Sequence, residues 1–215
     1  MVRLMIDDLY EVMPWEALDN VVFDVGNVLL SFNPQQILEE LIPDASLYPV
    51  LLERVFHSPY WLMQDRGLLT SLEAIPVMVG RHKELEAPIR TIMEHWRELK
   101  QAVPEGVEAL RAAKAHGKRI YILSNYGKDA FAYIQQQYDF FELVDGFTVS
   151  SRLGLCKPDP AIYRNVIQTW DLNAERTLFI DDSPANIECA LHEGWQGFCL
   201  NRPGKLHDFL HGPVI

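Results

Sequence analysis

The chain has 215 residues, 48% of them hydrophobic, which suits one domain, or one domain with an insert, around a sizeable core. Its formal net charge of −11 at pH 7 argues against nucleic acid and against an anionic membrane surface as partners. No apolar run approaches about 18 residues, acidic residues interrupt the N-terminal stretch, and the three cysteines lack paired spacing, so we expect a cytoplasmic protein without a membrane span.

The first 19 residues predict a helical lead-in that is interrupted at Pro14 and has no assigned function. An apolar run rich in β-branched residues then predicts a buried strand over 21–23. Asp24 follows this run directly, so its carboxylate is expected at the tip of the strand. The carboxyl ends of strands in an open α/β sheet border the ligand crevice, although an Asp that caps a turn is the simpler alternative.

Residues 35–100 have a helical pattern and few features of strands. We expect helices near 35–41, 47–57, 71–83 and 87–100, and a turn over 64–71 around Gly67. A block of short helices inserted after the first strand predicts a small helical-bundle cap over 35–100. The core is then formed by 1–34 and 101–215.

After residue 101 the pattern alternates between helices and strands. Helices are predicted over 104–117, 128–138, 159–170, 184–193 and 205–210, and strands over 120–123, 146–150, 177–180 and 196–200. Strands that alternate with helices of this length are typical of an α/β protein with a doubly wound parallel sheet. The sequence therefore predicts this fold class for the core.

Carboxylates follow two of the predicted strands, at Asp24 and at Asp181–Asp182. Because parallel strands end at the same edge of a sheet, we expect these groups to converge although they lie far apart in the sequence. Carboxylates that lie close together repel one another and need a counter-charge, which a divalent cation with oxygen ligands supplies.

Hydrogen-bond donors and a cation are expected at the same edge. Ser124 and Asn125 follow the predicted strand at 120–123, where a hydroxyl and backbone N–H groups can donate to an anion. Lys157 lies on a loop before a predicted helix and offers a positive charge nearby. An acidic nucleophile, a metal, a lysine and donors together indicate phosphoryl transfer to a carboxylate.

Four motifs in order resemble those of the haloacid dehalogenase-like (HAD) hydrolase superfamily. They are Phe-Asp-Val-Gly-Asn-Val at 23–28, Leu-Ser-Asn at 123–125, Lys-Pro-Asp-Pro-Ala-Ile-Tyr at 157–163 and Phe-Ile-Asp-Asp-Ser-Pro-Ala-Asn at 179–186. The resemblance is to the subfamily IA-like branch, with a Rossmann-like core and a helical C1 cap. The Asp-x-Gly-Asn pattern of the first motif is similar to a subgroup of sugar-phosphate phosphatases.

The resemblance implies a nucleophile and a metal site. Asp24 corresponds to the aspartate that attacks phosphorus and forms an aspartyl-phosphate, which water then hydrolyses. Mg²⁺ is expected between the Asp24 carboxylate, the Gly26 carbonyl and Asp182, with water and a substrate oxygen completing its shell. Asp181 and Asn186 correspond to residues that orient these groups.

The resemblance also implies where the substrate phosphate binds. The expected contacts are Gly26, Asn27, Ser124, Asn125 and Lys157, the last offsetting the charge of nucleophile and phosphate. Arg66 lies in a turn that resembles a cap loop facing the active site, so it is a candidate substrate contact. A solvated turn arginine fits the sequence equally well.

One departure from the family pattern affects the chemistry. Phosphatases of this family usually carry a second Asp two residues after the nucleophile, as general acid and base, and Gly26 occupies that place here. Loss of a proton donor costs roughly 10²- to 10⁴-fold in rate where the leaving group needs protonation. We therefore expect either low intrinsic activity or a preference for good leaving groups.

The expected function is that of a Mg²⁺-dependent phosphatase for a small phosphorylated metabolite, with a sugar phosphate as one candidate and a monomer or homodimer as the assembly. A 2-haloacid dehalogenase is the alternative within the family, but Val28 and the pair Asp181–Asp182 stand where dehalogenases carry a hydroxyl residue and a Ser-Ser-Asn type motif. A catalytically weakened binding protein with the same fold is the alternative from another class.

Overall fold

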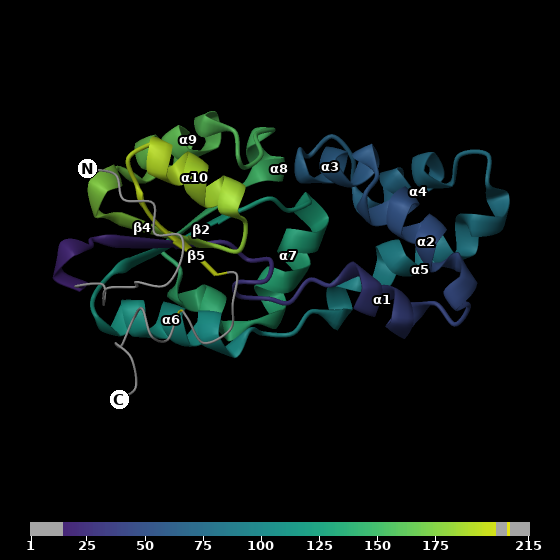
Figure 1. Ribbon diagram of the computed structural model, residues 1–215, viewed down its shortest axis with the longest axis horizontal. Helices are drawn as coiled ribbons and strands as arrows, with labels where there is room; N and C mark the ends of the chain where they lie inside the picture. The colour runs from purple at the N-terminus through teal and green to yellow at the C-terminus, as the bar shows by residue number, and fades with distance from the viewer. Residues whose placement is uncertain (1–14, 201–205, 207–215) are drawn as a thin grey trace.

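The computed structural model describes residues 15–200 and residue 206. Its centre is a parallel sheet of five strands in the order β3-β2-β1-β4-β5 (Figure 1). The strands are β1 (Asn20–Phe23), β2 (Arg119–Ser124), β3 (Gly146–Val149), β4 (Thr177–Asp181) and β5 (Gln196–Cys199). β1 is central, and Phe23 pairs with Ile122 of β2 on one side and with Ile180 of β4 on the other.

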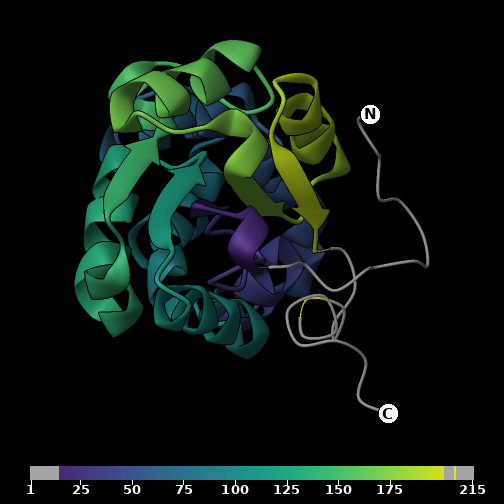
Figure 2. The same cartoon turned by 90° about the vertical axis from the view of Figure 1, so that its left-hand side faces the viewer.

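Helices cover both faces of the sheet (Figure 2). Successive side chains of a strand point to opposite faces, so Val21 and Phe23 belong to one hydrophobic core and Val22 to the other. The first core is shared with α6 (Pro104–Ala115) and α7 (Lys128–Gln137), and the second with α9 (Pro160–Trp170) and α10 (Pro184–His192). The predicted doubly wound α/β core is confirmed.

The helices between β1 and α6 form a separate lobe, at the right of Figure 1. They are α1 (Pro34–Leu41), α2 (Tyr48–Leu51), the π-helix η3 (Leu52–Phe56), α3 (Pro59–Asp65), α4 (Ser71–Val79), α5 (Glu86–His95) and the 3₁₀ helices η2 (Ala45–Leu47), η4 (Lys83–Leu85) and η5 (Trp96–Leu99). Several of them start at capped termini: Thr70 and Glu73 form a capping box at α4, and Ser58 and Asn33 cap α3 and α1. We refer to this lobe as the cap.

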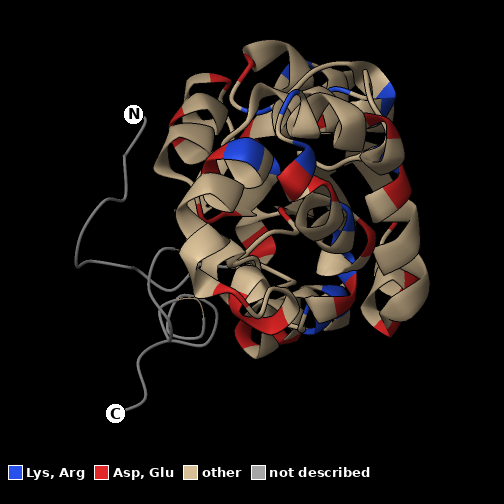
Figure 3. Ribbon diagram, turned by 90° about the vertical axis from the view of Figure 1, so that its right-hand side faces the viewer, with Lys and Arg blue, Asp and Glu red and all other residues tan. Residues whose placement is uncertain are grey.

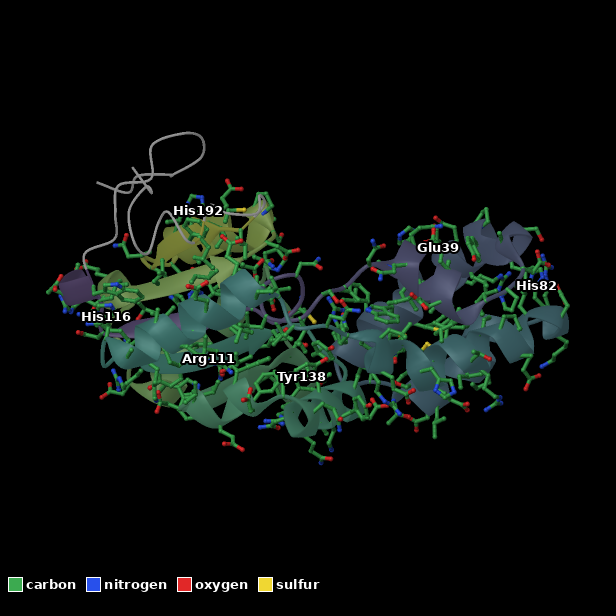
Figure 4. All side chains as sticks on the ribbon, turned by 90° about the horizontal axis from the view of Figure 1, so that it is seen from below. Glu39, His82, Arg111, His116, Tyr138 and His192 are labelled. Carbon is green, nitrogen blue, oxygen red and sulfur yellow. The ribbon has the colours of Figure 1, made fainter. Side chains whose placement is uncertain are left out.

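Two linkers connect the cap to the core and run side by side. Ser31 N–H donates to the Gln101 carbonyl at 2.8 Å, and Val103 N–H donates to the Leu29 carbonyl at 2.9 Å. The Tyr138 hydroxyl, on the core, donates to the Lys100 carbonyl at 2.6 Å (Figure 4). The second linker is therefore fastened both to the first linker and to the core.

The structure differs from the predicted elements in several places. Residues 59–65 form α3, which the sequence analysis did not assign, although Ser58–Pro59 is a typical helix start. The predicted lead-in is a short 3₁₀ turn, η1 (Trp15–Ala17), where it is described; its earlier part and most of the predicted 205–210 helix lie outside the described residues. The short α8 (Ser150–Leu153) directly after β3 was also not predicted.

Acidic and basic residues both occur at the cap end of the molecule (Figure 3). Within the described part of the chain, each helix is too short or too polar to cross a membrane.

Candidate active site

Three carboxylates lie together at the carboxyl edge of the sheet. Because β1 and β4 pair in register, Asp24 at the end of β1 lies beside Asp181 at the end of β4 and beside the next residue, Asp182. One carboxylate oxygen from each of the three lies within 4.8 Å of the others. The parallel sheet thus brings together groups from the first and fourth of the sequence motifs.

Lys157 lies between two of these carboxylates. Its side chain is almost fully buried, Nζ donates to Oδ2 of Asp181 at 2.6 Å, and Nζ forms an ion pair with Oδ1 of Asp24 at 2.9 Å. Burial alone lowers the pKa of Lys157, but the charges of Asp181 and Asp24 outweigh it and the net shift is upward. Lys157 is therefore a fixed positive charge beside the candidate nucleophile.

The side chain of Asn125 positions Lys157. The amide Nδ2 donates to the backbone carbonyl of Lys157 at 2.9 Å, and the amide Oδ1 accepts from the Lys157 N–H at 2.8 Å. This pairing holds the loop before α9 against the end of β2. Asn125 and the buried Ser124 also line the pocket described below, where the Ser124 hydroxyl faces Asp24.

Asp181 is fully buried, and its hydrogen bonds fix its orientation. Oδ1 accepts from the Ser183 N–H at 2.8 Å and from Asn186 Nδ2 at 2.9 Å, while Oδ2 accepts from Lys157 and from the same amide at 3.1 Å. Buried polar groups need such partners to be tolerated. These bonds occupy both oxygens, so Asp181 is suited to positioning Lys157 and its neighbours.

Asn27 contacts a carboxylate and lies outside the pocket lining. Its Nδ2 donates to Oδ2 of Asp182 at 3.0 Å, and its Oδ1 accepts from the Phe32 N–H at 2.8 Å. Its backbone is left-handed, with φ of 53°, a conformation that Asn adopts more readily than most residues. The sequence analysis expected Asn27 to contact the substrate phosphate. In the structure, its side-chain amide contacts the Asp182 carboxylate.

The electrostatics of the cluster fit a cation. Burial, together with the charge of Asp181, raises the pKa of Asp24 to about 6 against the opposing effect of Lys157. Burial also raises the pKa of Asp182. One lysine thus faces three carboxylates, and carboxylate oxygens are the ligand type that Mg²⁺ prefers. Of the groups expected from sequence to hold the ion, the structure brings Asp24 and Asp182 together, and Gly26 lines the pocket beside them.

A pocket lies between these groups and the cap and encloses about 620 Å³, its open mouth included. Aromatic rings line its cap side: Trp61 lies 5.7 Å from Phe32 and 5.1 Å from Trp96, and Trp96 lies 6.0 Å from Tyr126, between ring centroids. Asp24, Lys157 and Ser124 line its core side. A substrate in this pocket would place a polar group on the carboxylates and its remaining part against the rings.

Lys100 is a second lysine of this pocket, and the sequence analysis did not single it out. It is 7% exposed, and its Nζ lies 4.1 Å from the centre of the Phe32 ring and 5.1 Å from that of Trp96. Such cation–π contacts partly replace the lost hydration of an ammonium group. Burial lowers the pKa of Lys100 to about 7, against an opposing effect of Asp24.

The cap turn at 65–67 contributes Asp65 to the pocket. Arg66, the residue that the sequence analysis put forward, is exposed, lies outside the pocket lining and has its guanidinium beside the Cys156 thiol. Asp65 and Arg66 differ in this way because α3 ends here and consecutive side chains at its last turn point in different directions.

The fold and the site together define a capped enzyme whose core is a doubly wound parallel α/β sheet. Residues 18–192 match the family model of the haloacid dehalogenase-like hydrolases. The chain therefore belongs to the haloacid dehalogenase-like hydrolase family, as the four sequence motifs predicted.

Relatives of more than one activity are similar to this chain. A sesquiterpene phosphatase of Aspergillus oryzae is 26% identical over 83% of this chain and 88% of its own length. An (S)-2-haloacid dehalogenase of Pseudomonas putida is 25% identical over 91% of each chain. A HAD family enzyme of Bacteroides thetaiotaomicron, solved in complex with magnesium and inorganic phosphate, shares the fold with a TM-score of 0.69 and 19% identity over 85% of this chain and 93% of that one.

Proposed function

We propose that this hydrolase is a Mg²⁺-dependent phosphatase that acts on a small phosphorylated metabolite through a covalent intermediate on Asp24. The observation that carries the proposal is the charge arrangement around Asp24. Lys157 pairs with it, and Asp182 lies close enough to share a cation with it. This arrangement suits an anionic phosphoryl group, whose attack by a carboxylate needs several positive charges.

The residues of the site have separate tasks in this reaction. The Asp24 carboxylate attacks phosphorus, and Lys157 offsets the repulsion between the nucleophile and the phosphate. Ser124 and the backbone N–H groups after β2 donate to the phosphoryl oxygens. Asp181 and Asn125 hold Lys157 in place through the hydrogen bonds given above. Mg²⁺, when bound, supplies the remaining positive charge that neutralises the phosphoryl oxygens.

The pocket supports a substrate with an organic part that packs on aromatic rings. Phe32, Trp61 and Trp96 offer flat apolar faces, which stack against apolar chains, rings and the less polar faces of sugars. The sesquiterpene phosphatase among the relatives acts, by its name, on an apolar compound. A sugar phosphate and an isoprenoid phosphate are therefore the two substrate classes with which a screen should begin.

The dehalogenase activity remains the second candidate because a relative with that name covers 91% of this chain. The carboxylate cluster argues against it. A 2-haloacid is itself an anion, and it would enter a pocket bordered by Asp24 and the neighbouring acidic pair. Without a bound metal ion, these carboxylates repel a carboxylate substrate.

A phosphate-release screen tests the proposal. The purified protein is assayed against sugar phosphates, prenyl phosphates, nucleotides and p-nitrophenyl phosphate, with Mg²⁺ and with EDTA, and halide release from 2-chloropropionate is measured in parallel. We expect Mg²⁺-dependent phosphate release that Asp24→Asn abolishes. Halide release that survives EDTA, or phosphate release that survives Asp24→Asn, would contradict the proposal.

A further inference from the structure

The place of the usual proton donor is empty in this site. A Cβ atom built on Gly26 would meet no atom within 4 Å, so residue 26 leaves open space where the family commonly carries a second carboxyl. A phosphate monoester with an alkyl leaving group needs a proton on the departing oxygen. A donor is therefore required from elsewhere in the pocket.

Asp65 reaches the pocket from the opposite side, on the cap. It is the last residue of α3, it lines the same pocket as Asp24, and it is partly buried. Its backbone carbonyl accepts a hydrogen bond of 2.5 Å from the Ser150 hydroxyl of the core. The position of Asp65 relative to the core is thus fixed by a direct contact.

A second contact fixes the same turn. Gly67 has a left-handed φ of 70°, and a Cβ there would lie 2.1 Å from the Ser151 carbonyl oxygen. Only glycine allows the turn to approach α8 this closely. Residues 65–67 are therefore held against the core on both sides of Arg66, and the Asp65 side chain is the one that this docking directs into the pocket.

We propose that Asp65 is the general acid and base of this enzyme and replaces, from the cap, the carboxyl that Gly26 lacks. The inference rests on the proposed phosphatase function. It also revises the expectation from sequence, because a donor on the cap allows turnover of substrates with poor leaving groups.

The surroundings of Asp65 raise its pKa, so that a large fraction of the carboxyl is protonated near neutral pH. Burial and the charge of Asp24 raise the pKa of Asp65 to about 7, against an opposing effect of Lys157. The other titratable groups near it are Tyr126, whose hydroxyl is enclosed, and the Cys156 thiol; Lys100 lines the pocket but is not among the charges that shift Asp65. A bound phosphate dianion adds negative charge and favours the protonated form further.

The Asp65 carboxyl alone can supply and take up the proton in both half-reactions. In the first, the Asp24 carboxylate forms a bond to phosphorus, the bond from phosphorus to the leaving oxygen breaks, and the Asp65 proton passes to that oxygen to give the free alcohol. In the second, water attacks phosphorus and Asp65 takes one of its protons. The bond to Asp24 then breaks, inorganic phosphate leaves, and Asp65 is again protonated.

The test compares two substrates whose leaving groups differ in basicity. An alkyl phosphate that the screen identifies needs the proton, whereas p-nitrophenyl phosphate does not. Asp65→Asn keeps the shape and removes the proton donor. The later hydrolysis of the aspartyl-phosphate is common to both substrates and does not enter kcat/KM, so we expect kcat/KM for the alkyl phosphate to fall about 10²-fold or more and kcat/KM for p-nitrophenyl phosphate to fall less than about 5-fold. Glu94→Gln, an exposed change on α5 of the cap, is the matched control and should alter neither.

A rescue and a pH profile complete the design. Gly26→Asp in the Asp65→Asn protein restores a carboxyl on the core side, and we expect it to recover at least about 10-fold of the lost alkyl phosphate activity. In the unmodified protein, the ratio of kcat/KM for the alkyl phosphate to kcat/KM for p-nitrophenyl phosphate should fall as pH rises through about 7. Ionisations of the enzyme that affect both substrates alike cancel in this ratio.

The outcomes separate the two proposals. A protein that hydrolyses no phosphate monoester overturns the proposed function and this inference with it. An active protein in which Asp65→Asn lowers kcat/KM equally for both substrates, or in which Lys100→Met rather than Asp65→Asn causes the selective loss of kcat/KM, overturns only the inference. The pH ratio needs no variant, so a flat ratio would overturn it even if Asp65→Asn does not fold.

Discussion

The hydroxyl of Ser150 donates a hydrogen bond to the backbone carbonyl of Asp65 and accepts one from the backbone N–H of Tyr126. The two bonds measure 2.5 Å and 3.0 Å. One buried side chain thus connects the cap turn with the loop that follows β2, where Ser124 and Asn125 face the pocket. The position of the cap over the nucleophile depends on this connection.

Replacing Ser150 by Ala should weaken this connection. The Asp65 carbonyl and the Tyr126 N–H would each lose a partner, and a buried polar group left without one costs about 1–3 kcal/mol. We expect faster amide hydrogen exchange over 59–67 and a fall in kcat/KM of about 10-fold, which corresponds to about 1.4 kcal/mol. Exchange unchanged from the parent protein would contradict this role.

Ser151 provides a matched control for that change. It is the next residue along α8, and its hydroxyl is buried without a hydrogen-bond partner among the described residues. Removal of an unpaired buried hydroxyl is neutral or favourable. Ser151→Ala should therefore leave the melting temperature and the exchange over 59–67 unchanged or slightly improved.

The ionised Asp24 carboxylate should reduce the stability of the metal-free protein. Asp24→Asn removes a buried charge that Asp181 repels, while Lys157 keeps its bond to Asp181. We expect the variant to be inactive yet more stable at pH 7, by up to about 3 kcal/mol. Chemical denaturation with EDTA present measures the difference, and Asp139→Asn, at an exposed carboxylate, should change stability by less than about 0.5 kcal/mol.

The stability difference between Asp24→Asn and the parent protein depends on pH because the pKa of Asp24 is raised on folding. The folded pKa of Asp24 is about 6 and its ordinary value is 3.8, so between these values the folded state holds a proton that the unfolded state has lost. Stability conferred by that proton is lost as pH rises through the window, and the cost is constant above it. The advantage of Asp24→Asn should therefore vanish below about pH 4, and an advantage that persists there would have another cause.

The convergence of the three carboxylates could be predicted from sequence because two local patterns determine it. A buried strand that ends in a carboxylate is visible at Asp24 and again at Asp181, and the alternation of strands with helices implies parallel pairing. Parallel pairing then brings the strand ends to one edge. The convergence therefore required no knowledge of tertiary contacts.

The cap side of the pocket could not be predicted in the same way. Which residue of the turn at 65–67 faces the pocket depends on how the cap docks on α8, and that docking rests on the Ser150 hydroxyl and on the close approach of Gly67 to Ser151. Lys100 appears in the sequence as one more charge after a polar helix. Only the packing of Phe32 and Trp96 around its Nζ distinguishes it.

Magnesium should stabilise the protein if the carboxylate cluster binds it. A ligand at about 100 times its Kd adds about 2.7 kcal/mol, which for a chain of this size raises the melting temperature by roughly 5 °C. Asp182→Asn removes one of the oxygens that can approach the ion together with Asp24, so it should abolish the Mg²⁺-dependent rise. Asp139→Asn should retain the rise, and an equal rise in the Asp182 variant would place the ion elsewhere.

Lys100→Met should make the protein more stable and a weaker binder of its substrate. The ammonium is buried against Phe32 and Trp96, and burial lowers its pKa to about 7 from 10.5. Between these values the unfolded state holds a proton that the folded state has lost, so the stability of the parent protein rises as pH rises from about 7 toward 10. The stabilising effect of Lys100→Met should accordingly be largest at pH 7 and below, and smaller at pH 9.

Lys100→Met should weaken substrate binding while it raises the stability of the protein. The Lys100 ammonium attracts a phosphorylated ligand in the pocket, and this attraction is stronger there than in water because the surroundings are apolar. We therefore expect KM for an anionic substrate to rise about 10-fold in Lys100→Met with little change in kcat. Lys114→Met, at a surface lysine paired with Asp145 on the core, should alter neither KM nor the pH dependence of stability. A variant with unchanged KM but raised stability would show that Lys100 adds charge to the pocket without contacting the substrate.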